Sequence, residues 1–266
     1  MNARILHVSD LHAGRHESPE VEQALAAFVA ERQPGLVIAS GDLTHRGRRD
    51  QMERTHAFLA SLGPPVLAVP GNHDIPAISP KRFLAPWAEF ERVWGTCEPV
   101  HSGPELHVVG LNSVRPYRHQ SGGLGGGRLH GAVARLREAP DGALRVAVLH
   151  HQLMAAPWRA ARKRPLAQRG RVLRALADAG ANLILSGHIH QSSVGERREF
   201  EVLGEGDRGV VLATAPGFGQ PRPNRLGEAR GLHLIGHDAE TVEVETFLWS
   251  GGAFRLDATR RFSRAS

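Results

Sequence analysis

The sequence contains a single cysteine, Cys97, among its 266 residues, so an intramolecular disulfide is excluded. It has no uninterrupted apolar stretch of membrane-spanning length, and its first residues, MNARILHVSD, lack the apolar core of a signal peptide. Nothing in the sequence therefore points to an oxidising compartment or to a bilayer. We expect a cytoplasmic protein with no membrane partner.

The basic residues outnumber the acidic ones, and the formal net charge is +6. Such a charge suits a partner that carries phosphate, such as a nucleotide or a nucleic acid. However, most of the basic residues are arginines scattered along the chain, which a biased genomic composition explains equally well. The length suits one large domain, and because no break in composition divides the chain, we expect a single domain over residues 1–266.

The first part of the chain alternates short aliphatic runs with longer helical patterns, which is typical of βαβ units in an α/β fold. The expected strands cover residues 4–9, 35–40, 65–70, 106–112 and 143–151, and another begins at residue 181. The expected helices cover residues 19–32, 49–62, 80–94, 128–139 and 169–180. A Gly-rich segment between Asn112 and Arg128 is expected to be a surface loop, either a connector or the rim of an active site.

After residue 209 the pattern changes to strands separated only by turns, over residues 209–215, 231–237 and 241–249. Strands without intervening helices pair in antiparallel fashion. They form either a second, mostly antiparallel sheet or the edges of a mixed one.

Asp, Asn and His residues follow five of the expected strands, each time at the point where the strand ends. The five motifs are SDLH, SGDLTHRG, PGNHD, LHHQ and SGHIH. In open α/β sheets, ligand sites form at the carboxyl ends of the strands. Carboxylate and imidazole groups together suit divalent metal ions. This set is large enough to hold two ions, as in two-metal hydrolases.

The motifs differ in how specific they are. Asp10 and Asp42 would each serve as an ordinary cap at a strand end, and Asn72 would serve as a turn residue beside Gly71. In contrast, GNHD is expected in only about one shuffled chain in a thousand. The five motifs together, each at a strand end, indicate a catalytic site.

In this order and spacing, the five motifs resemble those of the calcineurin-like metallophosphoesterase superfamily over the span from Asp10 to His190. The resemblance implies a four-layer αββα sandwich, in which two mixed sheets are flanked by helices. It implies one metal ion held by Asp10, His12 and His190, a second held by Asn72, His150 and His188, and Asp42 bridging the two.

The same resemblance implies roles for two further residues of the GNHD motif. His73 is similar to the family's histidine that contacts the phosphoryl oxygen or protonates the leaving group, and Asp74 to the carboxylate that orients it. The choice between His150 and His151 stays open, because Gln152 departs from the family's motif at that position.

These roles imply hydrolysis of a phosphoester by a metal-bound hydroxide, with no covalent enzyme intermediate. Two divalent ions lower the pKa of a bound water and stabilise the charge that develops at phosphorus. The donor set admits Mn, Fe, Zn or Co, and the sequence does not choose among them.

Among the superfamily, the motifs GDLTHRG and GHIHQS are most similar to class III cyclic-nucleotide phosphodiesterases and related small bacterial phosphodiesterases. We therefore expect a phosphodiesterase of cyclic nucleotides or other small phosphodiesters. The alternatives are a DNA repair-type nuclease, a phosphomonoesterase and, less favoured, a non-catalytic scaffold. A nuclease would need basic residues interleaved with aromatic ones, which this sequence lacks.

Several basic residues are candidates for contacts with the substrate. They are His45, Arg115, Arg118, Arg128 and the run from Arg159 to Arg164. Each is also explained as a solvated surface charge.

Overall fold

The computed structural model describes residues 4–15, 18–155, 163–219, 221 and 227–264. The helices are α1 (Pro19–Arg32), α2 (Arg49–Ser61), α3 (Lys81–Leu84), α4 (Ala88–Trp94), α5 (Gly126–Arg137), α6 (Arg169–Asp178) and the 3-10 helix η1 (Arg197–Glu199). The strands are β1 (Ile5–Val8), β2 (Leu36–Ala39), β3 (Val66–Ala68), β4 (Val100–Ser102), β5 (Leu106–Leu111), β6 (Leu144–His151), β7 (Leu183–Gly187), β8 (Ser193–Glu196), β9 (Val211–Thr214), β10 (Gly231–His237), β11 (Thr241–Ser250) and β12 (Ala253–Ser263). Among the described residues, no helix combines the length and the apolar character needed to cross a bilayer.

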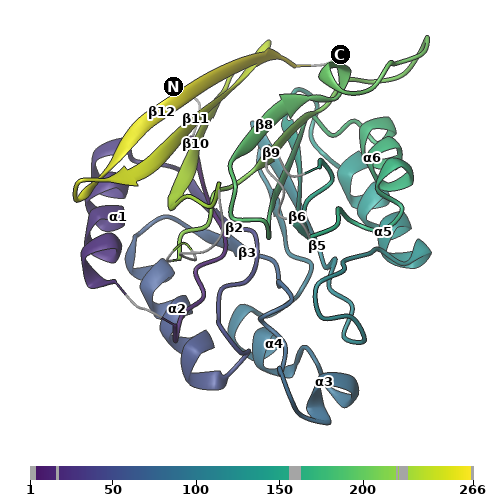
Figure 1. Cartoon of the computed structure of the whole chain (residues 1–266). Helices are drawn as coiled ribbons and strands as arrows, with labels where there is room; N and C mark the ends of the chain where they lie inside the picture. Colours follow the sequence, from purple (N-terminus) through teal and green to yellow (C-terminus); the bar gives the residue numbers. More distant parts are fainter. Residues whose placement is uncertain (1–3, 16–17, 156–162, 220, 222–226, 265–266) are drawn as a thin grey trace.

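The strands form two sheets of six (Figure 1). The first has the order β12-β11-β10-β1-β2-β3, in which β1, β2 and β3 are parallel and β10, β11 and β12 form an antiparallel edge. The second has the order β4-β5-β6-β7-β9-β8, with four parallel strands at its centre and an antiparallel strand at each edge. Both sheets are therefore mixed, as the resemblance implied.

The buried apolar residues form three hydrophobic cores, because successive residues of a strand face opposite sides of its sheet. In β1, Ile5 lies in the core between the two sheets, whereas Leu6 and Val8 lie in the core under α1 and α2. A third core packs α5 and α6 against the outer face of the second sheet. The layers are therefore helices, sheet, sheet and helices (Figure 1), and the predicted αββα sandwich is confirmed.

The structure differs from the expected elements in one helix and in three strands, two of which are the short edge strands β4 and β8. The helix expected over residues 80–94 is broken into α3 and α4, because Pro86 disfavours helical geometry at Ala85, whose φ is −148°. The long strand β12 was not expected at all. It lies at the edge of its sheet and most of its side chains are exposed, so its sequence lacks the alternation of apolar and polar residues that marks a strand.

The parallel strands place the five motifs at one edge of the molecule. Asp10 follows β1, Asp42 follows β2 and Asn72 follows β3 in the first sheet. His150 ends β6 and His188 follows β7 in the second. The two sheets therefore contribute their carboxyl ends to the same site.

The core beneath α5 should respond strongly to truncation of Leu136, which is fully buried there. We expect Leu136→Ala to lower the free energy of unfolding by about 2–5 kcal/mol, through lost burial and the cavity that remains. Urea denaturation of the two proteins measures this difference. Leu256→Ala, on the exposed side of β12, is the matched control and should change stability little. Equal effects of both substitutions would contradict this description of the core.

Candidate metal centre

The loops that carry the motifs have an unusual backbone. Asp10, His12, Asp42, His188 and His190 all have positive φ values, between 51° and 76°. Left-handed geometry costs a residue with a side chain about 1–2 kcal/mol. These five costs are offset by contacts around the loops, such as the hydrogen bonds from the Asp10 amide to the Gly41 carbonyl (2.9 Å) and from the His188 amide to Asp10 Oδ2 (2.8 Å).

A first cluster joins the end of β1 to the loop after β7. His190 Nε2 lies 3.1 Å from Asp10 Oδ1, and His12 Nε2 lies 3.2 Å from His190 Nε2. All three ligand atoms lie within 4.8 Å of one another. Burial lowers the pKa of His12 to about 3, so its ring is neutral and its nitrogen lone pair is available to a metal ion.

A second cluster joins the ends of β2, β6 and β7. His150 Nε2 lies 3.3 Å from Asp42 Oδ1 and 3.2 Å from His188 Nδ1. His150 Nδ1 donates to the carbonyl of Ser40 (2.8 Å), which leaves Nε2 facing the cluster. Burial alone would lower the pKa of His150, but the carboxylate of Asp42 outweighs it and raises the pKa to about 9.

Asp42 connects the two clusters. Its Oδ1 faces His150, while its Oδ2 lies 3.9 Å from His12 Nε2 in the first cluster. The loop that carries Asn72 packs closely on it, because a Cβ at Gly71 would collide with the Asp42 carboxylate. Asp42 is thus placed within reach of both groups of histidines.

His150 and His151 point in different directions. His150 contacts Asp42, whereas His151 is buried with its Nδ1 2.9 Å from Ser113 Oγ. Gly122 of the Gly-rich loop packs directly on the His151 ring, where a Cβ would collide. The geometry therefore favours His150 over His151 as the member of the second cluster.

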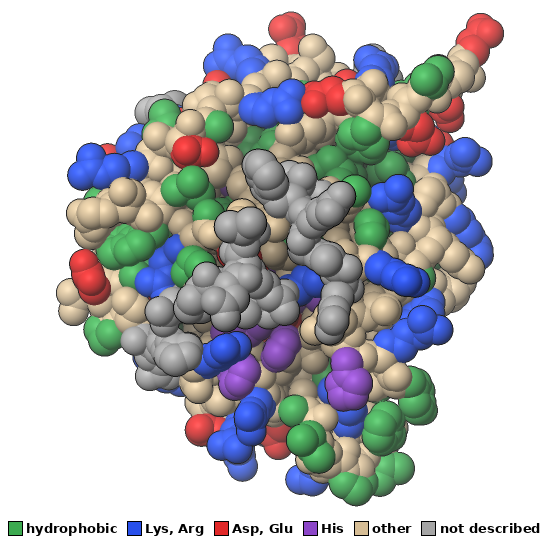
Figure 2. Space-filling model, viewed as in Figure 1, with side chains coloured by type: hydrophobic (Ala, Val, Ile, Leu, Met, Phe, Trp, Pro, Cys, Tyr) green, Lys and Arg blue, Asp and Glu red, His purple; other side chains and the backbone are tan. Residues whose placement is uncertain are grey.

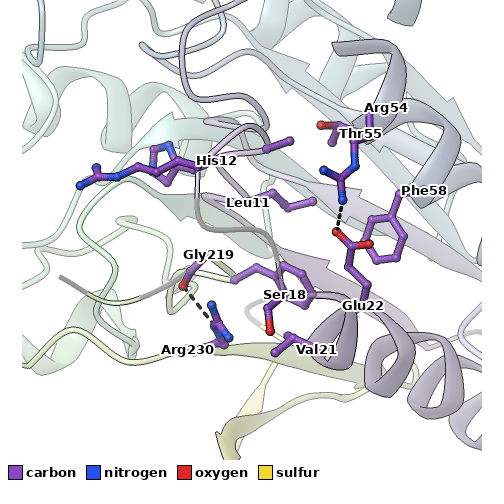
Figure 3. Close-up of a pocket in the computed structure, with 13 residues that line it drawn as sticks. Leu11, His12, Ser18, Val21, Glu22, Arg54, Thr55, Phe58, Gly219 and Arg230 are labelled. Atoms are coloured by element: carbon purple, nitrogen blue, oxygen red, sulfur yellow. Dashed lines mark hydrogen bonds and ion pairs between the residues drawn. The ribbon is translucent and has the colours of Figure 1, made fainter. Parts of the chain in front are cut away.

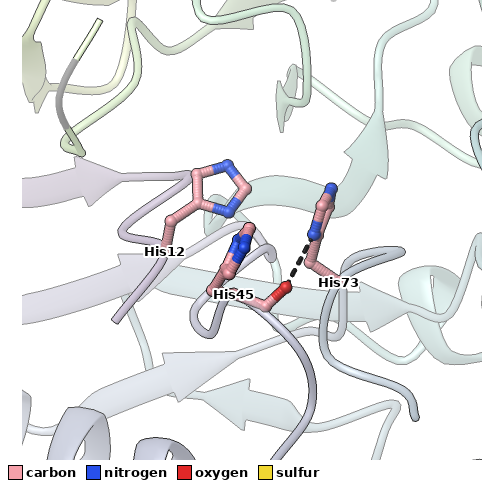
Figure 4. Close-up of side chains that lie close together, drawn as sticks. All are labelled: His12, His45 and His73. Atoms are coloured by element: carbon pink, nitrogen blue, oxygen red, sulfur yellow. Dashed lines mark hydrogen bonds between the residues drawn. The ribbon is translucent and has the colours of Figure 1, made fainter. Parts of the chain in front are cut away.

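His73 lies beside the first cluster (Figure 4). Its ring is 4.9 Å from the His12 ring and stacks on His45 at 5.7 Å. His73 Nδ1 donates to the His45 carbonyl (2.9 Å), so Nε2 is the nitrogen left to face a ligand. The three imidazoles form a third group whose nitrogen atoms lie within 4.8 Å of one another.

Asp74 has different partners from those expected. Its carboxylate accepts hydrogen bonds from the amides of Leu43, Thr44 and Gly71 and from the Thr44 hydroxyl. Among the described hydrogen bonds, none joins Asp74 to the His73 ring. Burial and the neighbouring carboxylate of Asp42 raise the pKa of Asp74 to about 6. Asp74 therefore ties the GNHD loop to the loop after β2, and the His45 carbonyl holds the His73 ring.

The basic residues expected to contact the substrate have different surroundings in the structure. The Arg128 guanidinium lies over the Trp87 ring (5.8 Å) and near Glu98, away from the clusters. Arg118 is exposed, and the Arg115 guanidinium packs against the Gly-rich loop at Gly123. Of the run from Arg159 to Arg164, residues 159–162 lie outside the described residues.

Two residues outside the five motifs lie beside the histidines. The Lys163 ammonium, part of the basic run from Arg159 to Arg164, donates to the His188 carbonyl, and a Glu228 carboxylate oxygen lies 3.8 Å from His190 Nδ1. This distance is too long for a hydrogen bond, so Glu228 places a negative charge near the His190 ring without bonding to it. Glu228 comes from the segment between β9 and β10, which carries no motif.

A cavity opens beside His12, between α1 and α2 (Figure 3). Its lining combines apolar side chains with a charged pair, namely Leu11, Val21, Phe58, Phe218, Glu22 and Arg54. Arg54 Nη2 and Glu22 Oε1 are 3.1 Å apart. A cavity with mostly apolar walls and one ion pair therefore lies next to His12.

The residues at the site suit two divalent ions. Asn72 Oδ1 is buried and has no hydrogen-bond partner among the described residues, although it has a lone pair that a cation would satisfy. Asp10 and Asp42 are both fully buried, and burial opposes their ionisation, yet the neighbouring histidines outweigh it and hold both pKa values well below the usual range. Buried carboxylates beside neutral imidazoles are the donor set of divalent-metal sites.

We expect each chain to bind two Mn²⁺ ions and to become more stable on binding. An ion at 100 times its dissociation constant adds about 2.7 kcal/mol per site, which thermal melting with and without a chelator measures. Loading should also release protons near neutral pH, because the proton on His150 must leave. His56→Gln, on α2 beside Trp94, is the control and should bind both ions. Fewer than two ions per wild-type chain would contradict the two-site interpretation.

Comparison with known proteins identifies the family to which this chain is similar. The family model described as Calcineurin-like phosphoesterase matches residues 3–192. A probable cyclic nucleotide phosphodiesterase of Synechococcus sp. is 29% identical over 237 residues, covering 83% of this chain and 84% of that protein.

Solved structures share the fold at low sequence identity. A dimetal phosphatase from Danio rerio has a TM-score of 0.65 and 14% identity, covering 99% of this chain and 98% of the other. The purple acid phosphatase PPD1 from yellow lupin (Lupinus luteus) has a TM-score of 0.70 and 11% identity, covering 98% of this chain and 54% of the other. At these identities the likeness concerns the fold alone.

Proposed function

This chain belongs to the calcineurin-like phosphoesterase family, and from that premise we propose that it is a two-metal phosphodiesterase of cyclic nucleotides or other small diesters. The observation that carries the proposal is the position of Asp42 between two histidine clusters. The similarity to a probable cyclic nucleotide phosphodiesterase supports the choice of substrate.

The proposed ligand assignment follows the two clusters. Asp10, His12 and His190 would hold one ion, His150 and His188 would hold the other, and Asp42 would be shared by both. Asn72 would join the second set through its buried Oδ1. When bound, two such ions supply a water of lowered pKa and stabilise the negative charge of an in-line displacement at phosphorus. The Ser40 carbonyl, which accepts from His150 Nδ1, holds the His150 ring with Nε2 towards the cluster.

His73 is proposed as the group that donates a proton to the leaving oxygen. Its ring lies next to that of His12, and the His45 carbonyl fixes Nδ1 as the protonated nitrogen facing away from the ligands. In the imidazolium form Nε2 also carries a proton, and Nε2 is the atom that would pass this proton to the departing ester oxygen, leaving a neutral ring protonated at Nδ1. The cavity beside His12 offers apolar walls and the Glu22–Arg54 pair to the organic part of a diester.

Substitution of the bridging carboxylate tests the metal assignment. We expect Asp42→Asn to lower kcat about 100- to 1,000-fold on bis(4-nitrophenyl) phosphate with Mn²⁺ present, the size of effect that loss of a single electrostatic group causes in other active sites. The amide is isosteric, so circular dichroism should show an unchanged fold. Activity near the wild-type rate would rule out a bridging role.

Substitution of His73 tests proton donation separately. We expect His73→Gln to lower kcat about 100- to 10,000-fold on a diester with a poor leaving group. The loss should be much smaller on bis(4-nitrophenyl) phosphate, because 4-nitrophenolate leaves without protonation. Ion binding should be unchanged, which separates this variant from Asp42→Asn. Equal losses on both substrates would contradict the role of a proton donor.

A substrate panel tests the choice of a small diester. Cyclic nucleotides, linear diesters, monoesters and single-stranded DNA are each assayed with Mn²⁺, and we expect the highest kcat/KM on one of the small diesters. Faster turnover of DNA than of every small diester would instead assign the chain to the nucleases of its family. Absence of both metal binding and hydrolysis would favour a scaffold.

A further inference from the structure

Four large apolar side chains are exposed together at one end of the molecule. Ile78 is 96% exposed, Leu84 83%, Tyr117 80% and Phe83 51%. We call these four residues the apolar tip. Figure 2 shows hydrophobic side chains gathered at this lower end of the view, over α3 and the loop after β5, with Lys and Arg side chains around them. Contiguous exposed apolar patches mark interaction surfaces in soluble proteins.

The apolar tip is held in a defined conformation. The rings of Phe83, in α3, and Tyr117, in the loop after β5, stack at 5.4 Å with an interplanar angle of 25°. The neighbouring side chain of Arg82 is buried, and its Nε donates to the Pro116 carbonyl (2.8 Å) while its Nη1 donates to the Pro76 carbonyl (3.0 Å). The buried Arg82 guanidinium therefore joins the loop before α3 to the loop after β5, and both segments expose apolar side chains.

The two segments that supply the apolar tip carry charge of one sign. The sequence contains no Asp or Glu from Ile75 to Ala88 and none from Leu106 to Arg137, the two segments that supply the tip. The same segments include Lys81 and Arg118, directly beside the apolar residues in sequence. The surface therefore combines exposed aliphatic and aromatic side chains with basic ones, and no carboxylate in either segment opposes an anionic partner.

We propose that the apolar tip docks the protein on the surface of an anionic phospholipid bilayer. Aliphatic and aromatic side chains enter the region between headgroups and acyl chains, while basic residues contact the lipid phosphates. A second copy of the chain fits this surface poorly, because symmetric pairing would bring Lys81 and Arg118 of two copies with a net charge of +6 together. The expectation of no membrane partner came from the absence of a spanning segment, which peripheral docking does not require.

Docking in this way would place the candidate metal centre close to the bilayer. Ile78 follows Asp74 by four residues, and Tyr117 follows the end of β5. Strand β5 pairs in parallel with β6, which carries His150, and β6 pairs in parallel with β7, which His188 follows. The tip and the clusters therefore belong to the same edge of the two sheets. Docking itself does not rest on the proposed function, because it needs neither metal ions nor turnover.

The test measures binding of the full chain to vesicles in the absence of substrate. Vesicles of phosphatidylglycerol and phosphatidylethanolamine are compared with vesicles of phosphatidylcholine by co-sedimentation. We expect binding only to the anionic vesicles, weakening as salt is raised, and a loss of about tenfold or more in the partition coefficient for the double variant Ile78→Ser/Leu84→Ser. Val202→Ser is the matched control, since Val202 is 99% exposed on another loop, and it should bind like the wild type.

Three results would overturn the proposal. The first is failure of the wild-type chain to bind anionic vesicles at low salt. The second is a wild-type dimer in light scattering that the double variant converts to a monomer, because the tip would then be covered by a second copy. The third is a raised KM of the double variant for bis(4-nitrophenyl) phosphate without vesicles, because the tip would then contact substrate. The double variant's rate on that soluble diester also shows whether catalysis survives independently of docking.

Discussion

Asp42 is a buried carboxylate between two groups of buried histidines, and the arrangement of the surrounding loops depends on it. Its two oxygens face different groups, Oδ1 towards His150 and Oδ2 towards His12. The amide of His73 also donates to Oδ1, at 2.8 Å. One side chain at the end of β2 thus connects the loops after β1 and β3 in its own sheet with a strand of the other sheet. Asp42 can contact both groups only because the parallel strands of the two sheets have their carboxyl ends at the same edge of the molecule.

Much of this arrangement could be predicted from the sequence, because parallel strands bring their carboxyl ends together whatever the details of packing. Short aliphatic runs followed by Asp, Asn or His marked the ends of β1, β2, β3, β6 and β7. The mixed sheets and the outer helices followed from the same alternation and from resemblance to a family. Residues at strand ends are predictable in this way because their position along the strand fixes where they lie.

Other parts could not be predicted, since they depend on contacts between segments far apart in sequence. Glu228 reaches His190 from a segment without a motif, and only the folded chain places it there. The resemblance favoured His150 as a ligand, but the Ser40 carbonyl that directs its Nε2 towards Asp42 is a backbone group that no side-chain pattern reveals. The resemblance also gave Asp74 the role of orienting His73, whereas in the structure its oxygens accept from the amides of Leu43, Thr44 and Gly71. β12 was missed because an exposed edge strand needs no apolar alternation.

The left-handed backbone at Asp10, His12, Asp42, His188 and His190 affects how this chain can evolve. Glycine adopts such φ values without strain, and asparagine tolerates them better than most residues do. Replacement of one of these five residues by either would relieve backbone strain and, at the aspartates, remove a buried charge. Variants that lose the proposed metal ligands therefore need not lose the fold, and can keep the loops as a rigid surface.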